Sequence, residues 1–224
     1  PNRVLFLDRL KHSMQIAKRD NNKVALVFID LDHFKEINDS IGHHAGDYIL
    51  KECARRLKSM LRSIDTVSRF GGDEFTVILE KMNNENEIVD IVLLIIDKLQ
   101  EPYIYENRKL YCGASVGISI YPENGKTHQE LLKNADAAMY KAKENGRNTY
   151  SFYTKTMTKK AHERVIQETK LRESMKNDDF TVYYQPLMNI NTHEIIGYEA
   201  LLRCIDIDDT VMYPDNFISI IEAM

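Results

Sequence analysis

The sequence predicts a fold of the α+β class, in which a central, mostly antiparallel sheet is surrounded by helices. The first observation is a pair of strand-like runs on either side of Gly71-Gly72, a pattern typical of a tight hairpin. The second is the near-continuous apolar run over residues 24–29, as expected for a strand buried on both faces. The third is a series of amphipathic segments with helical spacing between these strands. Antiparallel hairpins mixed with helices favour this class over a doubly wound parallel sheet.

Element boundaries follow from hydrophobic periodicity and from the residues that end each segment. We expect helices over residues 5–19, 34–40, 45–61, 85–101 and 127–145. We expect strands over residues 23–30, on both sides of Gly71-Gly72, and over the extended run 109–121. Pro102 ends the fourth helix, and Gly146 lies where a residue with left-handed backbone ends the fifth.

A polar segment over residues 154–177 separates the two parts of the chain. Apolar side chains recur in it at near-helical intervals, so we expect a linker helix. A helix lying on a membrane surface is the alternative, although its apolar face is thin. We therefore predict domains over residues 1–153 and 178–224, joined by this linker.

Composition excludes some classes of function. The chain has 224 residues and a net charge of −4, so we expect one to two domains and no DNA or RNA partner. The widely spaced Cys53, Cys112 and Cys204 indicate reduced thiols in a cytoplasmic protein. The sequence contains no evident signal peptide or membrane span. It begins at Pro1 without a methionine, so we expect a piece of a longer protein, which other segments could anchor to a membrane.

Two acidic clusters lie at the ends of predicted strands. Asp30 and Asp32 end the first buried strand, and Asp73-Glu74 follow the turn at Gly71-Gly72, where we expect positive φ at both glycines. Carboxylates at the end of a buried strand pack poorly but suit a hard divalent cation. If the hairpin lies beside the first strand, Asp30 and Asp73 share one site, and a cation reverses the sign of their repulsion.

These motifs, with others in the same order, resemble the GGDEF family of diguanylate cyclases, which condense two GTP molecules into cyclic di-GMP and release pyrophosphate. The similarity covers residues 1–153, and its motifs are Pro1-Asn2-Arg3 and residues 30–39, 42–47, 62–65, 71–75, 115–119, 135–143 and 146–148. The resemblance implies a nucleotide-cyclase-like sheet ringed by helices, Mg²⁺ or Mn²⁺ as cofactor, and a homodimer in which each chain holds one GTP.

The resemblance also implies a catalytic centre. Asp30, Asp73 and the backbone carbonyl of Leu31 match the family's metal ligands. Glu74 is either a general base for the 3′-hydroxyl or part of a second metal site, and the sequence leaves open which of Asp73 and Glu74 takes the proton. Lys35 matches the lysine that steadies the transferring phosphate. The alternative for the acidic residues is that they are solvated carboxylates beside a turn. The alternative for Lys35 is that it is a solvated lysine at the start of a helix.

The nucleotide contacts follow by the same match. The positions implied in GTP binding are His33, Phe34, Lys35, Asn38, Asp47, Gly71, Gly72, Lys143 and Arg147. Asn38 and Asp47 match the guanine readers, and an amide beside a carboxylate suits the two donors that adenine lacks. The alternative is a helix cap, because both residues lie near the starts of predicted helices. Lys143 and Arg147 match the pair that grips the terminal phosphates; the alternative is a charge complement to the helix dipole.

Arg62 and Asp65 match the family's inhibitory site, which binds the product cyclic di-GMP. An arginine can contact guanine or phosphate in bidentate fashion, which favours this role. The alternative is a local surface salt bridge, because this pattern is common outside the family.

A second resemblance, to the EAL domain, begins near Phe180. Residues 184–187 and 196–203 resemble the opening of that TIM-like barrel, which hydrolyses cyclic di-GMP with bound metals. Glu199 matches one of its metal ligands, and Gln185 and Arg203 match substrate contacts. A barrel of this kind takes about 250 residues. We therefore expect residues 178–224 to form an incomplete stub without phosphodiesterase activity.

The expected function is a diguanylate cyclase of bacterial second-messenger signalling, inhibited by its product. The alternative is a catalytically silent domain that binds GTP or cyclic di-GMP and regulates an EAL phosphodiesterase. The intact Asp73-Glu74 pair argues against the alternative, because a sensor does not need both carboxylates beside a complete phosphate grip.

Overall fold

The computed structural model describes residues 3–177, 179–205, 211–214 and 217–221. The chain divides into two compact units, Pro1–Thr158 and Lys159–Met224, and each is described by itself. Pro1 and Asn2 of the first motif lie outside the described residues. A helix, α6 (Lys155–Lys176), occupies most of the predicted linker. The domain boundaries at residues 153 and 177 stay a prediction.

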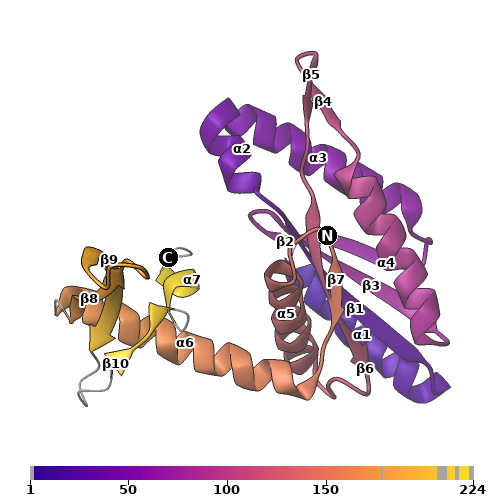
Figure 1. Cartoon of the computed structure of the whole chain (residues 1–224). Coiled ribbons are helices and arrows are strands. Elements are labelled where there is room, and N and C mark those ends of the chain that lie inside the picture. Colours follow the sequence, from indigo (N-terminus) through magenta and orange to yellow (C-terminus); the bar gives the residue numbers. More distant parts are fainter. Residues whose placement is uncertain (1–2, 178, 206–210, 215–216, 222–224) are drawn as a thin grey trace. The chain divides into compact units, whose positions relative to one another are not determined.

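The first unit is built on a five-stranded sheet in the order β2-β3-β1-β6-β7 (Figure 1). Its strands are β1 (Lys23–Leu31), β2 (Thr66–Gly71), β3 (Glu74–Met82), β6 (Ala114–Tyr121) and β7 (Tyr150–Phe152). All neighbouring pairs are antiparallel except β6 and β7, which are parallel. The predicted α+β class with a mostly antiparallel central sheet is therefore confirmed.

Five helices and a short hairpin surround this sheet. The helices are α1 (Arg3–Asp20), α2 (Phe34–Ile41), α3 (His43–Met60), α4 (Glu85–Gln100) and α5 (His128–Glu144). The hairpin of β4 (Tyr103–Tyr105) and β5 (Arg108–Leu110) projects from the top of the view in Figure 1. Each helix boundary lies within two residues of its predicted position. Hydrophobic periodicity and the residues that terminate each segment were therefore sufficient to predict these five helices.

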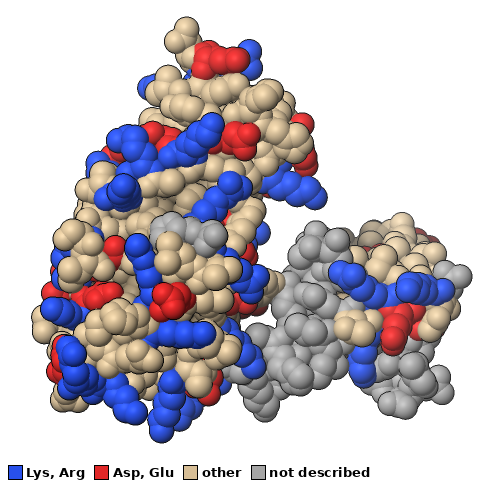
Figure 2. Space-filling model, turned by 180° about the vertical axis from the view of Figure 1, so that it is seen from behind, with Lys and Arg blue, Asp and Glu red and all other residues tan. Residues whose placement is uncertain are grey.

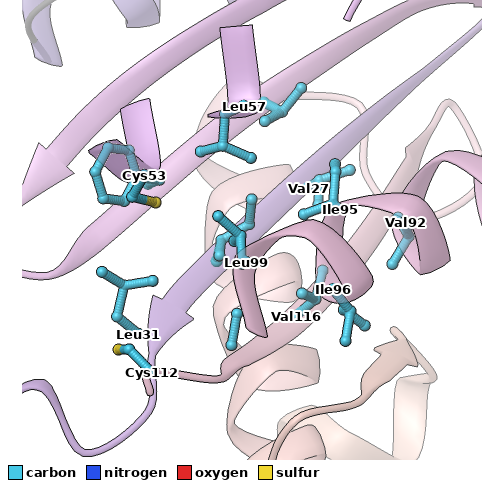
Figure 3. Close-up of a cluster of buried hydrophobic side chains, with 14 of the residues drawn as sticks. Val27, Leu31, Cys53, Leu57, Val92, Ile95, Ile96, Leu99, Cys112 and Val116 are labelled. Carbon is cyan, nitrogen blue, oxygen red and sulfur yellow. The ribbon is translucent and has the colours of Figure 1, made fainter. Parts of the chain in front are cut away.

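The central strand β1 is buried on both faces, as its continuous apolar run predicts. Val24, Leu26 and Phe28 belong to the cluster formed with α1 and α5. Val27 and Ile29 belong to the cluster on the opposite face, where α3 and α4 contribute. Figure 3 shows part of this second cluster. The sheet is therefore a middle layer between two layers of helices, and β1 is buried between them.

The turn of the predicted hairpin differs from expectation. Gly71 stays in β2 opposite Glu74, so the loop is Gly72-Asp73, and of the two glycines only Gly72 has a positive φ, of 44°. The prediction of positive φ at both glycines is wrong. The register shifts between Arg69 and Gly71, and the ring of Phe70 packs edge-on against two buried rings, Phe6 and Phe28. This bulge moves the loop by one residue.

The extended run predicted over residues 109–121 is also interrupted. It contains the end of β5 and the whole of β6, with residues 111–113 in neither strand. The Gly113 carbonyl accepts the Asp32 N–H at 2.9 Å, and the Cys112 thiol lies 3.3 Å from the Asp32 carbonyl. These contacts bind the segment to the end of β1, so it does not continue the hairpin ladder.

The second unit contains part of α6 and a three-stranded antiparallel sheet in the order β10-β9-β8. Its strands are β8 (Phe180–Met188), β9 (Ile195–Ile205) and β10 (Val211–Met212), followed by α7 (Ile218–Ile221). Leu171, Cys204 and Phe217 form its small buried cluster. A partial EAL stub was predicted for this part of the chain.

The surface of the described part of the chain is mixed in charge. On the face seen in Figure 2, Lys and Arg side chains of the first unit are spread out, with Asp and Glu between them. No helix among the described residues is both long and apolar enough to span a bilayer. All three cysteines are buried and free of disulfide bonds, as predicted.

Candidate functional site

Asp30 and Glu74 are direct cross-strand partners at one end of the sheet. Asp30 is the second-last residue of β1, and Glu74 is the first residue of β3. The preceding residue, Asp73, accepts the backbone N–H of Leu31 through its carbonyl at 3.3 Å. The hairpin therefore lies beside the first strand, as predicted, and all four residues predicted as metal ligands, Asp30, Leu31, Asp73 and Glu74, lie where these strands end.

The two facing carboxyl groups have raised pKa values. Burial is the main cause for Asp30, which is 8% exposed, and the charges of Asp73 and Asp32 add to it. Burial is also the main cause for Glu74, followed by the nearby charge of Asp30. Like charges in a poorly solvated place disfavour the ionised form. In the ligand-free protein the ionised acidic pair is therefore electrostatically unfavourable.

The ammonium group of Lys143 partly offsets this repulsion. Its Nζ lies 2.7 Å from Oδ1 of Asp30, and this pair lowers the Asp30 pKa against the effect of burial. Lys143 comes from the last turn of α5, which the sheet brings beside β1. A side chain predicted to grip phosphate thus acts as the counter-ion of a predicted metal ligand.

The residues present fit a hard divalent cation. Among the described residues, no three His, Cys, Asp or Glu side chains form a preformed metal cluster. However, Asp30 and Glu74 face each other, and Asp30 already binds a cation, the Lys143 ammonium. Carboxylate and carbonyl oxygens are the donors that Mg²⁺ and Mn²⁺ take. Metal binding by Asp30, Leu31, Asp73 and Glu74 stays a prediction.

The start of α2 offers backbone donors near this acidic end. His33 has a left-handed φ of 59°, and the helix has no side-chain cap. The first N–H groups of a helix lack intrahelical partners and favour anions. Phe34 is buried, whereas Lys35 is exposed on the same turn. This arrangement can bind a phosphate, and the contact of Lys35 with it stays a prediction.

Asn38, a predicted guanine reader, packs against α3. A Cβ on Gly46 would collide with the Asn38 amide, so only glycine allows this approach. The Oδ1 atom of Asn38 is buried and has no hydrogen-bond partner among the described residues. A buried, unpaired amide oxygen is costly unless a ligand satisfies it. This atom is therefore a candidate acceptor for a ligand donor.

Asp47 follows Gly46 on α3 and lines a cavity of about 780 Å³. The predicted inhibitory pair, Arg62 and Asp65, lines the same cavity. The cavity also has an excess of basic side chains: Arg9, Lys51, Lys58, Arg62 and Arg69. Sequence reasoning assigned Asp47 and the Arg62–Asp65 pair to separate sites, and the structure brings them to one cavity.

Arg62 and Asp65 form the local salt bridge that the sequence left as an alternative. The Asp65 carboxylate accepts from Nε of Arg62 at 3.1 Å and from the backbone N–H groups of Arg62 and Glu80. The side chain of Asp65 is 1% exposed, whereas that of Arg62 is 43% exposed. Asp65 thus stabilises the turn, and part of the Arg62 guanidinium remains open to a ligand.

Arg147 lies in the turn after α5 and takes no part in the ion pair that Lys143 forms with Asp30. It is exposed and lines a cavity of about 470 Å³ with His33 and Asp32. The predicted phosphate pair is therefore divided between an ion pair with Asp30 and an open cavity.

Asp32 is a site residue for which sequence reasoning assigned no role. Its carboxylate is 4% exposed and accepts two hydrogen bonds, from Ser115 and Asn148. The available signal was its position two residues after Asp30, in the polar segment after a buried strand.

The three predicted EAL residues lie in the second unit. Gln185 of β8 and Glu199 of β9 are cross-strand partners, and both are exposed. Arg203 is buried, and its guanidinium stacks on Tyr213 at 4.8 Å from the ring centre. The structure brings Gln185 and Glu199 together, and their roles stay predictions.

Comparisons with known proteins agree with this architecture. Residues 1–149 match the family model described as "Diguanylate cyclase, GGDEF domain", and residues 168–224 match the model of the EAL domain. The bifunctional diguanylate cyclase/cyclic di-GMP phosphodiesterase MucR of Pseudomonas aeruginosa is 37% identical over 99% of this chain and 32% of its own length. The cyclic di-GMP phosphodiesterase NbdA of the same organism is 36% identical over 99% of this chain and 28% of its own length.

A solved structure extends the comparison to the fold. The crystal structure of the GGDEF domain of TpbB (YfiN) from Pseudomonas aeruginosa is 38% identical in sequence, with a TM-score of 0.67. The match covers 69% of this chain and 96% of that domain. The chain spans about a third of the length of the curated relatives described above.

Proposed function

Because this chain belongs to the GGDEF family of diguanylate cyclases, we propose that it condenses two molecules of GTP into cyclic di-GMP with release of pyrophosphate. The observation that carries the proposal is the facing pair Asp30 and Glu74, with Asp73 beside them and a cation already held at Asp30. Burial and like charges raise the pKa values of both carboxyl groups, and perturbed pKa values of this kind are typical of functional sites.

Asp30, Asp73 and the carbonyl of Leu31 would hold the divalent metal. Bound Mg²⁺ or Mn²⁺ would supply positive charge that neutralises the phosphate oxygens. Lys143, which pairs with Asp30 in this structure, would contact the terminal phosphates of the nucleotide. The uncapped start of α2 and Lys35 orient the phosphate that is transferred.

Glu74 is the residue to which we assign the proton of the 3′-hydroxyl. Burial and the charge of Asp30 raise its pKa, and a raised pKa makes a carboxylate a better base near neutral pH. The backbone carbonyl of Asp73 accepts the Leu31 N–H and so fixes this residue beside the end of β1, where its carboxylate can hold the metal. The 3′-oxygen then forms its bond to the α-phosphorus of the other GTP, and pyrophosphate leaves.

Two chains are needed for this reaction. Each holds one GTP, and each 3′-hydroxyl attacks the α-phosphate held by the other chain. The product is twofold symmetric, which favours a symmetric homodimer as the catalyst.

Product inhibition is supported by the cavity that Arg62 and Asp65 line. Its five basic side chains against two acidic ones suit a ligand with two phosphates, and the exposed part of Arg62 can contact guanine or phosphate. Asp47 lies on the same cavity, so product bound there would lie close to a predicted guanine reader.

The second candidate is a silent nucleotide-binding domain that regulates an EAL phosphodiesterase. The observations that favour it are the match to the EAL model and the relative NbdA, which is a phosphodiesterase. Turnover separates the candidates. Purified protein with Mg²⁺ should release pyrophosphate from GTP and not from ATP; tight GTP binding without any pyrophosphate release would favour the silent domain and reject the cyclase.

A further inference from the structure

The carboxylate of Asp32 binds two segments that are distant in sequence. It accepts hydrogen bonds from the Ser115 hydroxyl at 2.7 Å and from the backbone N–H of Asn148 at 2.9 Å. Asp32 is 4% exposed. Ser115 belongs to β6, and Asn148 lies in the turn after α5. A buried carboxylate with two such donors is well satisfied and need not bind any further cation.

The backbone of Asp32 is bound as firmly as its side chain. Its N–H donates to the carbonyl of Gly113 at 2.9 Å, and its carbonyl lies 3.3 Å from the thiol of Cys112. The end of β1, the start of β6 and the turn after α5 are therefore joined through one residue.

The turn that Asp32 holds has an unfavourable backbone. Arg147 and Asn148 have φ values of 61° and 46°, a region that L residues seldom adopt. Consecutive residues in this region persist only where their surroundings hold them. Two contacts join the turn to other parts of the fold: the Asn148 N–H bond to Asp32 and the side-chain bond from Asn148 to Gln100. The Gly146 and Arg147 N–H groups donate locally, to the carbonyls of Lys143 and Ala142 at the end of α5.

Gly113 makes room for this contact. A Cβ at that position would lie 3.0 Å from Oδ1 of Asn148 and 3.3 Å from Oδ2 of Asp32. Both distances are tighter than most Cβ contacts in proteins. A side chain at residue 113 would therefore require the Asn148 side chain or the Asp32 carboxylate to shift by a few tenths of an ångström.

Arg147 lies between two residues that the turn fixes. It is exposed, and with His33 and Asp32 it lines the cavity beside the uncapped start of α2. We propose that Asp32 is a positioning residue: it holds residues 146–148 in their left-handed turn so that Arg147 faces the terminal phosphates of the nucleotide. This inference rests on the proposed function, because it takes the nucleotide to be a triphosphate held by Arg147.

Comparing the affinities for a triphosphate and a monophosphate distinguishes a loss of Arg147 positioning from a general loss of nucleotide binding. The probes are Mg²⁺ with the non-hydrolysable β,γ-imido analogue of GTP, and GMP, in calorimetry on the purified chain. Asp32→Ala should weaken binding of the analogue about ten-fold, the loss expected for one charge-assisted hydrogen bond, and leave GMP binding nearly unchanged. Asp32→Asn should restore most of the affinity, because its amide can still accept from Asn148 and donate to Ser115. A metal ligand would not be rescued by the uncharged amide.

Two further variants make the test independent of how Asp32→Ala folds. Gly113→Ala should weaken binding of the analogue in the same selective way, because its methyl group presses on both the Asn148 side chain and the Asp32 carboxylate and strains their contact. Ser115→Ala is the matched control: it removes the other hydrogen bond of the same carboxylate and should keep the preference for triphosphate. In an Arg147→Ala background, Gly113→Ala should have no further effect on that preference, since Asp32 acts through Arg147.

Hydrogen exchange reports on the turn without any nucleotide. The Asn148 amide should be protected in the wild type and in Asp32→Asn, and should exchange faster in Gly113→Ala. Unchanged protection, or an unchanged triphosphate preference in Gly113→Ala, would overturn the positioning role. A wild-type protein that binds the analogue no better than GMP would instead reject the proposed function.

Discussion

Asp30 and Glu74 face each other across β1 and β3, and the ammonium of Lys143 lies 2.7 Å from the first of them. The ligand-free site is thus an acidic pair neutralised in part by a lysine that is predicted to bind phosphate. Under the proposed function, metal and Lys143 would compete for Asp30, and the nucleotide would give Lys143 a new partner. This competition makes the order of ligand binding measurable.

Replacing Lys143 should separate metal affinity from nucleotide affinity. In Lys143→Met, Mn²⁺ should bind more tightly without nucleotide, because the competing cation is gone. The GTP analogue should bind several-fold more weakly, because its terminal phosphates lose a partner. Electron paramagnetic resonance of Mn²⁺ and calorimetry measure the two affinities.

The matched control is Lys141→Met, which removes the ion pair of Lys141 with Glu144 on the same helix. It should change neither affinity. A Lys143→Met protein that binds Mn²⁺ no better than the wild type would contradict the competition.

Removing the charge of Glu74 should stabilise the ligand-free protein at neutral pH. Because the folded-state pKa of Glu74 is raised, its protonated form stabilises the fold below the ordinary glutamate pKa of about 4.3. That contribution is lost as the pH rises through the raised folded-state pKa. Glu74→Gln should therefore have a higher Tm than the wild type at pH 7.5, and the gain should disappear near pH 4.

Thermal unfolding at the two pH values checks this prediction. Glu106→Gln, in the exposed β4–β5 turn, provides the same chemical change as a control and should not alter Tm. An equal or lower Tm for Glu74→Gln at pH 7.5 would show that the ionised carboxylate is not under electrostatic strain.

The two glycines of the hairpin should respond oppositely to alanine. Gly72 has a φ of 44° and open space where a Cβ would lie, so Gly72→Ala should cost about 1 kcal/mol of unfolding free energy from backbone strain alone. Gly71 lies in β2 without a positive φ, and its Cβ would make only an ordinary contact with Glu74. Gly71→Ala should be neutral or slightly stabilising, and chemical denaturation measures both. Equal losses would contradict the turn that the structure shows.

Much of this site could be predicted from the sequence, because it depends on local signals. The buried run ending in Asp30 and the hairpin before Glu74 were enough to bring two carboxylates together. The position of the turn was missed, since the bulge at Phe70 depends on contacts with Phe6 and Phe28. No local pattern encodes these contacts.

The rest of the site depends on residues that are far apart in the chain. The Asp32–Asn148 hydrogen bond and the Lys143–Asp30 ion pair each join β1 to the end of α5 or to the turn after it. The match to the family motifs predicted that Lys143 binds phosphate, but it did not predict the ion pair of Lys143 with Asp30. The shared cavity of Asp47 and Arg62 likewise follows from the packing of α1, α3 and β2 and not from spacing.

Product inhibition should depend on Arg62 more than catalysis does. Arg62→Ala should weaken binding of cyclic di-GMP at least ten-fold, the loss of one bidentate contact, with little change in the initial rate. Arg55→Ala is the control, because Arg55 is exposed on α3, pairs with Glu52 and does not line the cavity. Titration of the cyclase rate with added cyclic di-GMP measures both. Inhibition that survives in Arg62→Ala would place the product elsewhere.

Product analysis with GTP tests the central claim most directly. Purified chain, at concentrations that allow two chains to pair, is incubated with GTP and Mg²⁺, and the nucleotides are separated and identified by mass spectrometry. We expect cyclic di-GMP from the wild type and at least a hundred-fold less from Asp73→Asn, a loss typical for a group that acts on the transition state. A wild type that binds GTP but forms no cyclic di-GMP, or an Asp73→Asn protein that forms as much as the wild type, would contradict the proposed function.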